Sequence, residues 1–181
     1  MQSLIGRRRL LGAAAAAFAT GLARPARAAP GPRLLSLDNL HTGEKLRAEY
    51  WADGAYQPDA LQAIDKVLRD FRTGEIHPIA PKLLDLLSQL HLQMETAQPF
   101  QVISGYRSPA TNAGLRQAGH SGVASQSLHM QGIAIDVRIP GKPLAGLHRA
   151  ALALGGGGVG YYPSSNFVHV DIGRVRRWSG A

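Results

Sequence analysis

Two short segments near the C-terminal end contain residue types that bind metal ions. Residues 127–136 (SLHMQGIAID) contain His129 and Asp136, and residues 167–171 (FVHVD) contain His169. Two imidazoles and one carboxylate form a common three-ligand set for zinc. Structural zinc sites have four protein ligands, whereas catalytic sites keep one position for water. The pattern therefore predicts a zinc site that activates water for hydrolysis.

Strands are the elements expected to position these side chains. Successive side chains of a strand face opposite sides of a sheet, and both segments alternate valine or isoleucine with other residues. If the predicted strands 132–139 and 167–172 belong to one sheet, Asp136 and His169 project from the same face. His129 lies on the loop that enters the first strand, so its side chain can reach over to complete the set.

The remainder of the chain predicts one α+β domain. Hydrophobic runs between turn residues predict further strands over 33–39, 45–51, 100–104 and 159–162. Apolar residues at helical spacing predict helices from Pro58 and from Pro81, a short helix near 111–117 and another long helix over 144–154. The small and polar residues 117–127 are expected to form a surface loop over the site.

Residues 1–28 are expected to be an export signal rather than part of the domain. Residues 7–11 (RRRLL) open a short run of apolar residues, and residues 26–28 (ARA) offer a cleavage site. The arginine pair directly before two leucines resembles a twin-arginine signal. The apolar run is too short to span a membrane, which takes about 20 residues. We therefore expect residues 29–181 to form a single domain in the periplasm, without stable membrane insertion.

The charge distribution limits the classes of ligand. The chain has a net charge of +8, but five arginines and no acid lie in the signal segment, so the remainder carries +3. This modest charge, without alternating aromatic and basic residues, argues against nucleic acid binding. After Glu95 the only acids are Asp136 and Asp171, against eight lysines and arginines, which favours an anionic substrate. The chain has no cysteine, which excludes disulfides and thiolate ligands.

The glycine-rich run over 155–160 matches the dinucleotide pattern GxGxxG in letters only. That fingerprint needs a strand before it and a helix after it, and here the predicted order is reversed. We expect these glycines to end the preceding helix and to let the backbone pass close to the site.

Three ordered motifs, residues 104–109 (SGYRSP), 127–136 and 157–171, resemble the murein endopeptidase K family. This family belongs to the wider group of zinc D-alanyl-D-alanine-type peptidases that cut peptidoglycan peptides. The similarity extends from LHTGE at 40–44 to Trp178 and covers nearly all of the chain after the signal segment. The resemblance implies an α+β fold whose small antiparallel sheet carries the metal site and packs with several helices. It also implies peptidoglycan as the partner and Zn²⁺ held by His129, Asp136 and His169.

The resemblance also places the turn 104–109 at the site. Arg107 on this turn is suited to a bidentate grip on a substrate carboxylate, although it could instead hold its own turn together. Ser104, Tyr106 and Ser127 are further candidates for hydrogen bonds to the substrate.

The sequence departs from the wider group at the general base. Related peptidases place a Glu or Asp a few residues before the last histidine ligand, but residues 161–168 contain no acid. Asp171 is either the base or a partner that orients His169, and His120 is another candidate proton carrier. We expect an endopeptidase acting on peptidoglycan cross-links or stems. The alternatives are a D,D- or L,D-carboxypeptidase and a noncatalytic peptidoglycan-binding module with a degenerate metal site.

Overall fold

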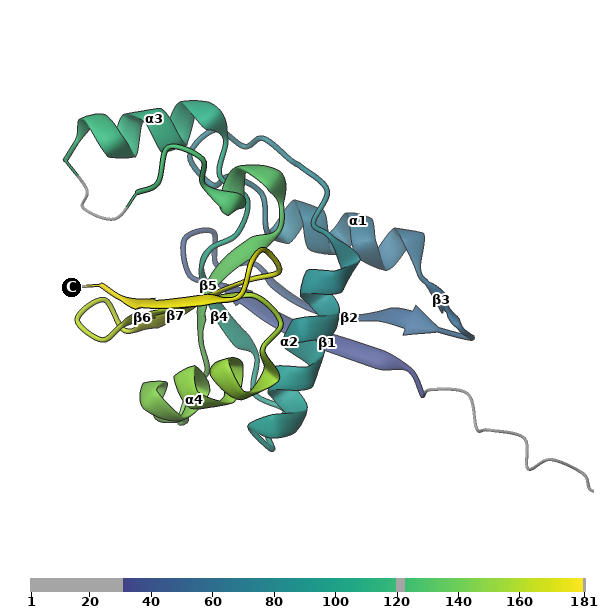
Figure 1. The fold of residues 1–181 in the computed structure, drawn as a ribbon. Coiled ribbons are helices and arrows are strands. Elements are labelled where there is room, and N and C mark those ends of the chain that lie inside the picture. The colour runs from purple at the N-terminus through teal and green to yellow at the C-terminus, as the bar shows by residue number, and fades with distance from the viewer. Residues whose placement is uncertain (1–30, 120–122, 181) are drawn as a thin grey trace, which may run out of the picture.

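A computed structural model describes residues 31–119 and 123–180 of the chain. Its strands are β1 (Arg33–Asn39), β2 (Lys45–Ala52), β3 (Ala55–Tyr56), β4 (Phe100–Ser104), β5 (Ala134–Arg138), β6 (Gly158–Tyr162), β7 (Phe167–Asp171) and β8 (Arg176–Ser179). Its helices are α1 (Pro58–Val67), α2 (Pro81–Gln93), α3 (Pro109–Gln117), the short 3-10 helix η1 (Leu128–Gln131) and α4 (Leu144–Leu154). The strands form an eight-stranded sheet in the order β3-β2-β1-β4-β5-β7-β6-β8. Helices α3 and α4 lie on opposite sides of the β6–β7 ribbon (Figure 1).

The expected α+β class is confirmed, and the sheet is mostly antiparallel. It is larger than the small sheet implied by the resemblance, because β3 and β8 extend it at its two edges. Strand β8 pairs with β6 in parallel, and β1 pairs with β4 in parallel. The expected strand from residue 132 begins at Ala134, because Gly132 has a φ of 65° and ends η1 instead.

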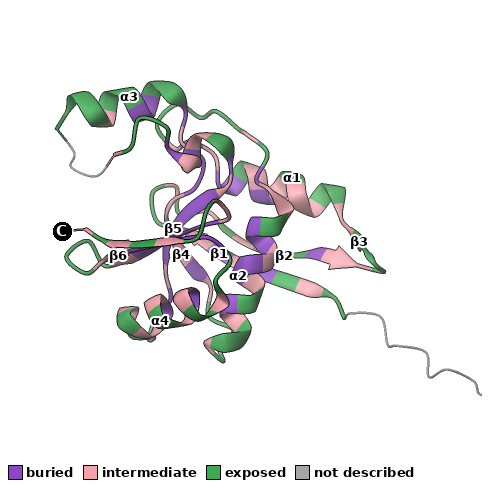
Figure 2. Cartoon of the chain, viewed as in Figure 1, coloured by how far each residue is buried: buried purple, intermediate pink, exposed green. Residues whose placement is uncertain are grey.

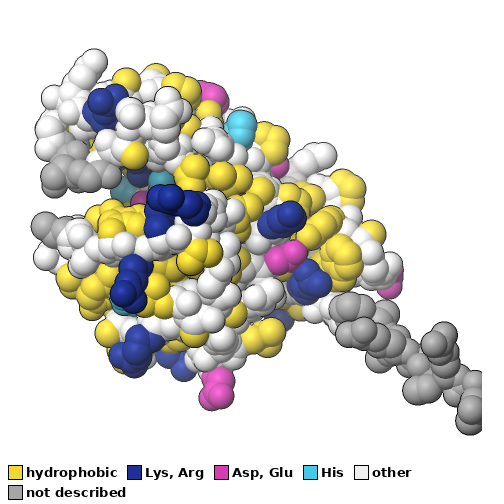
Figure 3. Space-filling model, viewed as in Figure 1, with side chains coloured by type: hydrophobic (Ala, Val, Ile, Leu, Met, Phe, Trp, Pro, Cys, Tyr) yellow, Lys and Arg dark blue, Asp and Glu magenta, His cyan; other side chains and the backbone are white. Residues whose placement is uncertain are grey.

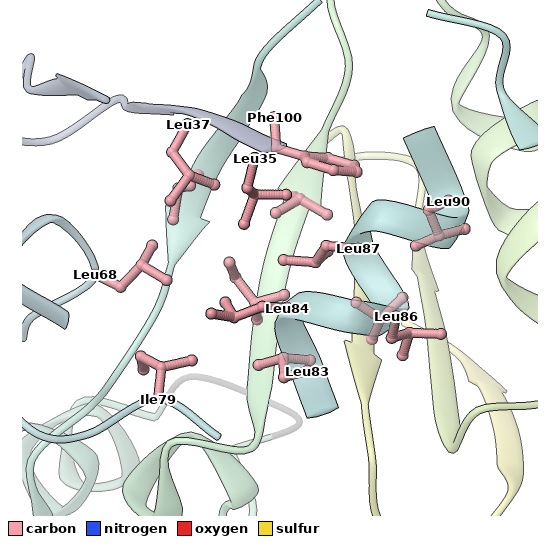
Figure 4. Packing of buried hydrophobic residues seen from close by; sticks show 14 of the residues in the cluster. Leu35, Leu37, Leu68, Ile79, Leu83, Leu84, Leu86, Leu87, Leu90 and Phe100 are labelled. Carbon is pink, nitrogen blue, oxygen red and sulfur yellow. The ribbon is translucent and has the colours of Figure 1, made fainter. Parts of the chain in front are cut away.

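The hydrophobic core lies between the sheet and helix α2. Figure 4 shows the leucines of α2 packed against Leu35, Leu37 and Phe100 from the central strands. The alternating residues of β5 and β7 complete the same face with Ile135, Val137, Val168 and Val170, all at most 1% exposed. Figure 2 shows this buried centre of the sheet in purple, with mostly exposed residues on the outer surface of α3. The other face of β5 and β7 is therefore left for polar side chains.

No helix within residues 31–119 and 123–180 is both long and apolar enough to cross a membrane. The expected signal segment and His120 lie outside the described residues.

Candidate metal centre

Three potential ligand atoms converge on the polar face of the sheet. The Nε2 atom of His129 lies 3.2 Å from Nδ1 of His169 and 3.3 Å from Oδ1 of Asp136. Nδ1 of His169 lies 2.8 Å from the same Oδ1. A tetrahedral zinc ion with bonds of about 2.0–2.1 Å has ligand atoms about 3.3 Å apart. The three side chains are all buried.

Strand register brings two of these side chains together. Asp136 of β5 lies directly opposite His169 of β7, and both face away from the hydrophobic core. The row continues on either side of this pair, because Ser104 lies opposite Asp136, and Gly160 lies opposite both His169 and Trp178. We call Ser104, Asp136, His169, Gly160 and Trp178 the site row. Asp136 and His169 thus project from the same face of the sheet, as the alternation of the two strands predicted.

Hydrogen bonds behind the two imidazoles define which nitrogens face the centre. Nδ1 of His129 lies 2.8 Å from the carbonyl oxygen of Gly105, so this nitrogen must carry a proton and donate it. Nε2 of His169 lies 3.0 Å from Oδ2 of Asp171 and donates to that carboxylate. The opposite nitrogens then present lone pairs toward one another and toward Asp136. Three converging lone pairs repel unless a cation lies between them, so this donor set fits a bound dication.

The pKa shifts of His169 and Asp136 also indicate that the site fits a bound cation. Burial alone would lower the pKa of His169, but hydrogen bonds to Asp136 and Asp171 outweigh it and raise the pKa to about 9. Burial alone would raise the pKa of Asp136, but the charges and hydrogen bonds of His129 and His169 hold it well below its usual range. Without a cation, a proton on His169 therefore offsets the buried negative charge, and a bound metal ion takes over that task.

Asp171 lies behind His169 rather than in front of the ligand atoms. Its side chain is fully buried, and its Oδ1 accepts hydrogen bonds from the backbone N–H groups of Gly158 (2.9 Å) and Gly173 (2.8 Å). Its Oδ2 accepts from His169 and from Nη2 of Arg176 (2.8 Å). A fully buried carboxylate held by these donors is placed to orient His169, one of the two roles that the sequence left open for Asp171.

The turn between β4 and α3 connects the metal centre to a neighbouring loop. The carbonyl of Gly105 holds His129, and a side chain at Gly105 would collide with the carbonyl oxygen of Leu68. Arg107 faces the centre, with Nη2 3.3 Å from Oγ of Ser104 and 3.8 Å from Oδ2 of Asp136. Ser104 therefore supports Arg107.

Tyr106 and Ser127 occupy different surroundings. The Tyr106 ring stacks on His77 with centroids 4.6 Å apart, and its hydroxyl donates to Glu75 at 2.7 Å. Tyr106 thus fixes the turn and is not among the residues that line the pocket. Its expected hydrogen bond to the substrate stays a prediction. Ser127 is buried and does line the pocket.

Asp70 anchors this turn, and its replacement tests the anchor. Burial alone would raise the pKa of Asp70, but hydrogen bonds from Thr111, Ser108 and the backbone of Arg72 lower it to about 2 from an ordinary value of 3.8. Because the folded-state pKa is depressed, the carboxylate stabilises the fold fully above about pH 4 and loses this effect as the pH falls through 2. We expect Asp70→Asn to lower the free energy of unfolding by about 2 kcal/mol at pH 7.

Urea unfolding at several pH values measures this effect. The difference between wild type and Asp70→Asn should shrink toward zero as the pH approaches 2. A difference that is constant between pH 7 and pH 2.5 would contradict the assigned role of the charge.

A pocket of about 300 Å³ opens over the metal centre. Figure 3 shows histidine and acidic side chains in a hollow beneath α3, with lysine or arginine side chains at its rim. An aromatic wall, defined as Tyr162, Phe167 and Trp178, bounds one side. Tyr162 and Phe167 stack with centroids 4.4 Å apart, and Nε1 of Trp178 donates to the Tyr162 hydroxyl at 2.8 Å. Among the described residues, Asp136 is the only acid that lines the pocket.

Sequence reasoning did not assign the aromatic wall or Arg176 to the site. The spacing in the sequence contained a signal for both. Gly158 and Gly160 are two residues apart in β6 and lie opposite Arg176 and Trp178, which are two residues apart in β8. A side chain at Gly160 would collide with the Trp178 indole. The expectation that the glycine run ends α4 and passes close to the site agrees with the structure, since Gly155 ends α4 and Gly160 belongs to the site row.

An α+β fold with two buried histidines and a carboxylate beneath an open pocket is typical of metal-dependent hydrolases. The family model described as peptidoglycan L,D-endopeptidase MepK, of the group Peptidase_M15_2, matches residues 27–178. The chain belongs to this family, which confirms the resemblance drawn from its three motifs.

Named relatives agree with the family match. The peptidoglycan L,D-endopeptidase MepK of Escherichia coli (strain K12) is 46% identical over 149 residues, covering 82% of this chain and 81% of the relative. A Haemophilus influenzae protein named "Probable peptidoglycan L,D-endopeptidase MepK" is 44% identical over 153 residues, with 83% and 81% coverage. The crystal structure of Serratia marcescens L-Ala D-Glu endopeptidase ChiX covers 53% of this chain and 71% of its own. Its TM-score of 0.34 at 21% identity is too low to support an argument about the site.

Proposed function

We propose that this protein is a zinc-dependent peptidase that hydrolyses L,D peptide bonds in peptidoglycan cross-links or stems. The observation that carries the proposal is the convergence of three lone pairs from His129, His169 and Asp136 beneath an open pocket. Family membership supports the reaction class, and the names of the relatives support peptidoglycan as the substrate and the L,D bond as the one cleaved.

Each side chain of the site has a task in this proposal. Bound zinc would polarise the scissile carbonyl and lower the pKa of a bound water to about 7. His129, Asp136 and His169 would hold it, and Asp171 would fix the ring of His169 from behind. Arg107 would bind a carboxylate of the stem peptide in the pocket. The aromatic wall would pack against apolar parts of the same peptide.

Digestion of purified sacculi tests the reaction. The protein is incubated with sacculi, and the muropeptides are separated by chromatography and identified by mass. We expect loss of cross-linked dimers with new termini at L,D bonds, and no change with a chelator or with His169→Ala. Shortened monomer stems with intact cross-links would indicate a carboxypeptidase instead. An unchanged profile from folded, zinc-loaded protein would favour the noncatalytic wall-binding module.

We also propose export to the periplasm by the twin-arginine route, supported by residues 7–11 (RRRLL) and by the peptidoglycan substrate. Replacing Arg8 and Arg9 together by lysine should leave the precursor in the cytoplasm, whereas Arg7→Lys keeps the pair and should be exported. Cell fractionation and N-terminal sequencing measure this, with Ala29 expected as the first residue. Unchanged export of the double variant would assign the signal to the general secretory route.

A further inference from the structure

Strand β8 places Arg176 behind the metal centre. Nη2 of Arg176 lies 2.8 Å from Oδ2 of Asp171, and its Nη1 lies 3.2 Å from Oδ1. The two parallel hydrogen bonds form the fork geometry in which Arg fixes the plane of a carboxylate. Oδ2 of Asp171 also accepts the hydrogen bond from Nε2 of His169. A continuous chain of contacts therefore runs from Arg176 through Asp171 to the imidazole whose other nitrogen faces the metal position.

The glycines of β6 make this contact sterically feasible. Gly158 lies opposite Arg176 in the β6–β8 pairing, and β6 separates β8 from β7, which carries Asp171. A side chain at Gly158 would collide with both Nη1 of Arg176 and Oδ2 of Asp171. Without a side chain there, the guanidinium reaches across β6 to β7.

Two further contacts hold the guanidinium in this position. Its Nη1 donates to the carbonyl oxygen of Arg174 at 3.0 Å, and its Cζ lies 4.9 Å from the ring centroid of Trp178. The Trp178 ring in turn lies against His169, with centroids 5.1 Å apart. The Arg176 side chain is 36% exposed, whereas Asp171 is fully buried. Arg176 is thus the link through which the last strand reaches the buried carboxylate.

We propose that Arg176 is a positioning residue for the metal centre, which fixes the Asp171 carboxylate so that Nδ1 of His169 is held toward the metal. This inference rests on the proposed function only in taking His169 as a ligand. Loss of the fork leaves the Asp171 carboxylate held only by Gly158, Gly173 and His169. The orientation of Oδ2 toward His169 is then less firmly fixed, and a buried charge has fewer partners. Mutations of such outer partners typically reduce metal affinity about 10- to 100-fold.

Zinc affinity of the full chain, measured by competition with a chelator, is the test. We expect Arg176→Met to weaken zinc binding about tenfold or more. Arg176→Lys should recover part of the loss, because it restores a charge without the fork. Arg177→Met is the matched control: Arg177 is the next residue of the same strand, is exposed, and pairs with Val159 on the other face of the sheet. It should bind zinc as tightly as wild type.

Two more measurements separate positioning from simple stabilisation. In an Asp171→Asn background, Arg176→Met should change zinc affinity less than twofold, because the link is already broken. The cobalt-substituted Arg176→Met protein should show a shifted visible absorption spectrum, and the Arg177→Met protein should not. Unchanged zinc affinity in Arg176→Met and Arg176→Lys, with only a lower melting temperature of the metal-free protein, would overturn the proposal. A wild-type protein that binds no zinc would instead overturn the proposed function, and this inference with it.

Discussion

Replacing His169 by alanine is expected to weaken zinc binding about 100-fold and to reduce turnover about 10³-fold. In structural zinc sites, about 10–16 kcal/mol of binding free energy is shared among four ligands, which is about 3 kcal/mol for each. The Lewis acid effect of the ion supplies several kcal/mol of transition-state stabilisation, and each 1.36 kcal/mol is tenfold in rate. The loss should appear in zinc titrations as well as in digestion of sacculi.

A matched histidine variant controls for the loss of an imidazole. His148 lies on α4 and stacks on Tyr161 with centroids 4.7 Å apart, on the face of the sheet opposite the metal centre. His148→Ala should retain wild-type zinc affinity and activity. If His169→Ala does not fold, His129→Ala removes a different ligand while leaving the Asp171–Arg176 pair intact. Full activity of either ligand variant would contradict the three-ligand centre.

The sequence predicts those features of the fold that depend on local pattern. The alternation of β5 and β7 follows from the two-residue period of a strand, so it predicted that Asp136 and His169 share a face. Proline positions predicted the beginnings of α1 and α2 at Pro58 and Pro81. Strand β8 was not predicted, because its pairing with β6 is parallel and joins segments with no tight turn between them.

Side-chain directions within a motif are harder to predict than the motif itself. Within SGYRSP, Arg107 lies at the pocket while Tyr106 turns to Glu75 and His77. These partners come from a loop that is distant in sequence, so spacing alone does not reveal them. The spacing of Asp171 from His169 predicted that they are neighbours on one strand face. Which imidazole nitrogen of His169 contacts Asp171 depends on the rotamer of the ring, which the spacing does not predict. In the structure Nε2 contacts Asp171, and this contact favours an orienting role for Asp171.

Arg107→Ala is expected to raise the KM for stem peptides about 10- to 100-fold while changing kcat little. The Arg107 side chain is 13% exposed, and its Nε is buried without a hydrogen-bond partner among the described residues. Burial lowers the pKa of this guanidinium, but it stays charged at neutral pH. A buried donor group that lacks partners favours a ligand that supplies acceptors, and a carboxylate supplies two. Hydrogen bonds to charged groups contribute about 1.5–3 kcal/mol, which sets the size of the effect.

The carboxylate assignment can be separated from a role at the reacting carbonyl. Wild-type protein should prefer a stem peptide with a free carboxylate over its amidated form, and Arg107→Ala should cleave the two equally well. Arg116→Ala, an exposed arginine on α3, is the control and should keep the wild-type preference. An equal fall in kcat and kcat/KM, with KM unchanged, would show that Arg107 contacts charge that develops only in the transition state. The Arg107 side chain makes one hydrogen bond, at 3.3 Å to Ser104, and lies 3.8 Å from Oδ2 of Asp136. Its removal should therefore lower the free energy of unfolding less than that of Asp70 does.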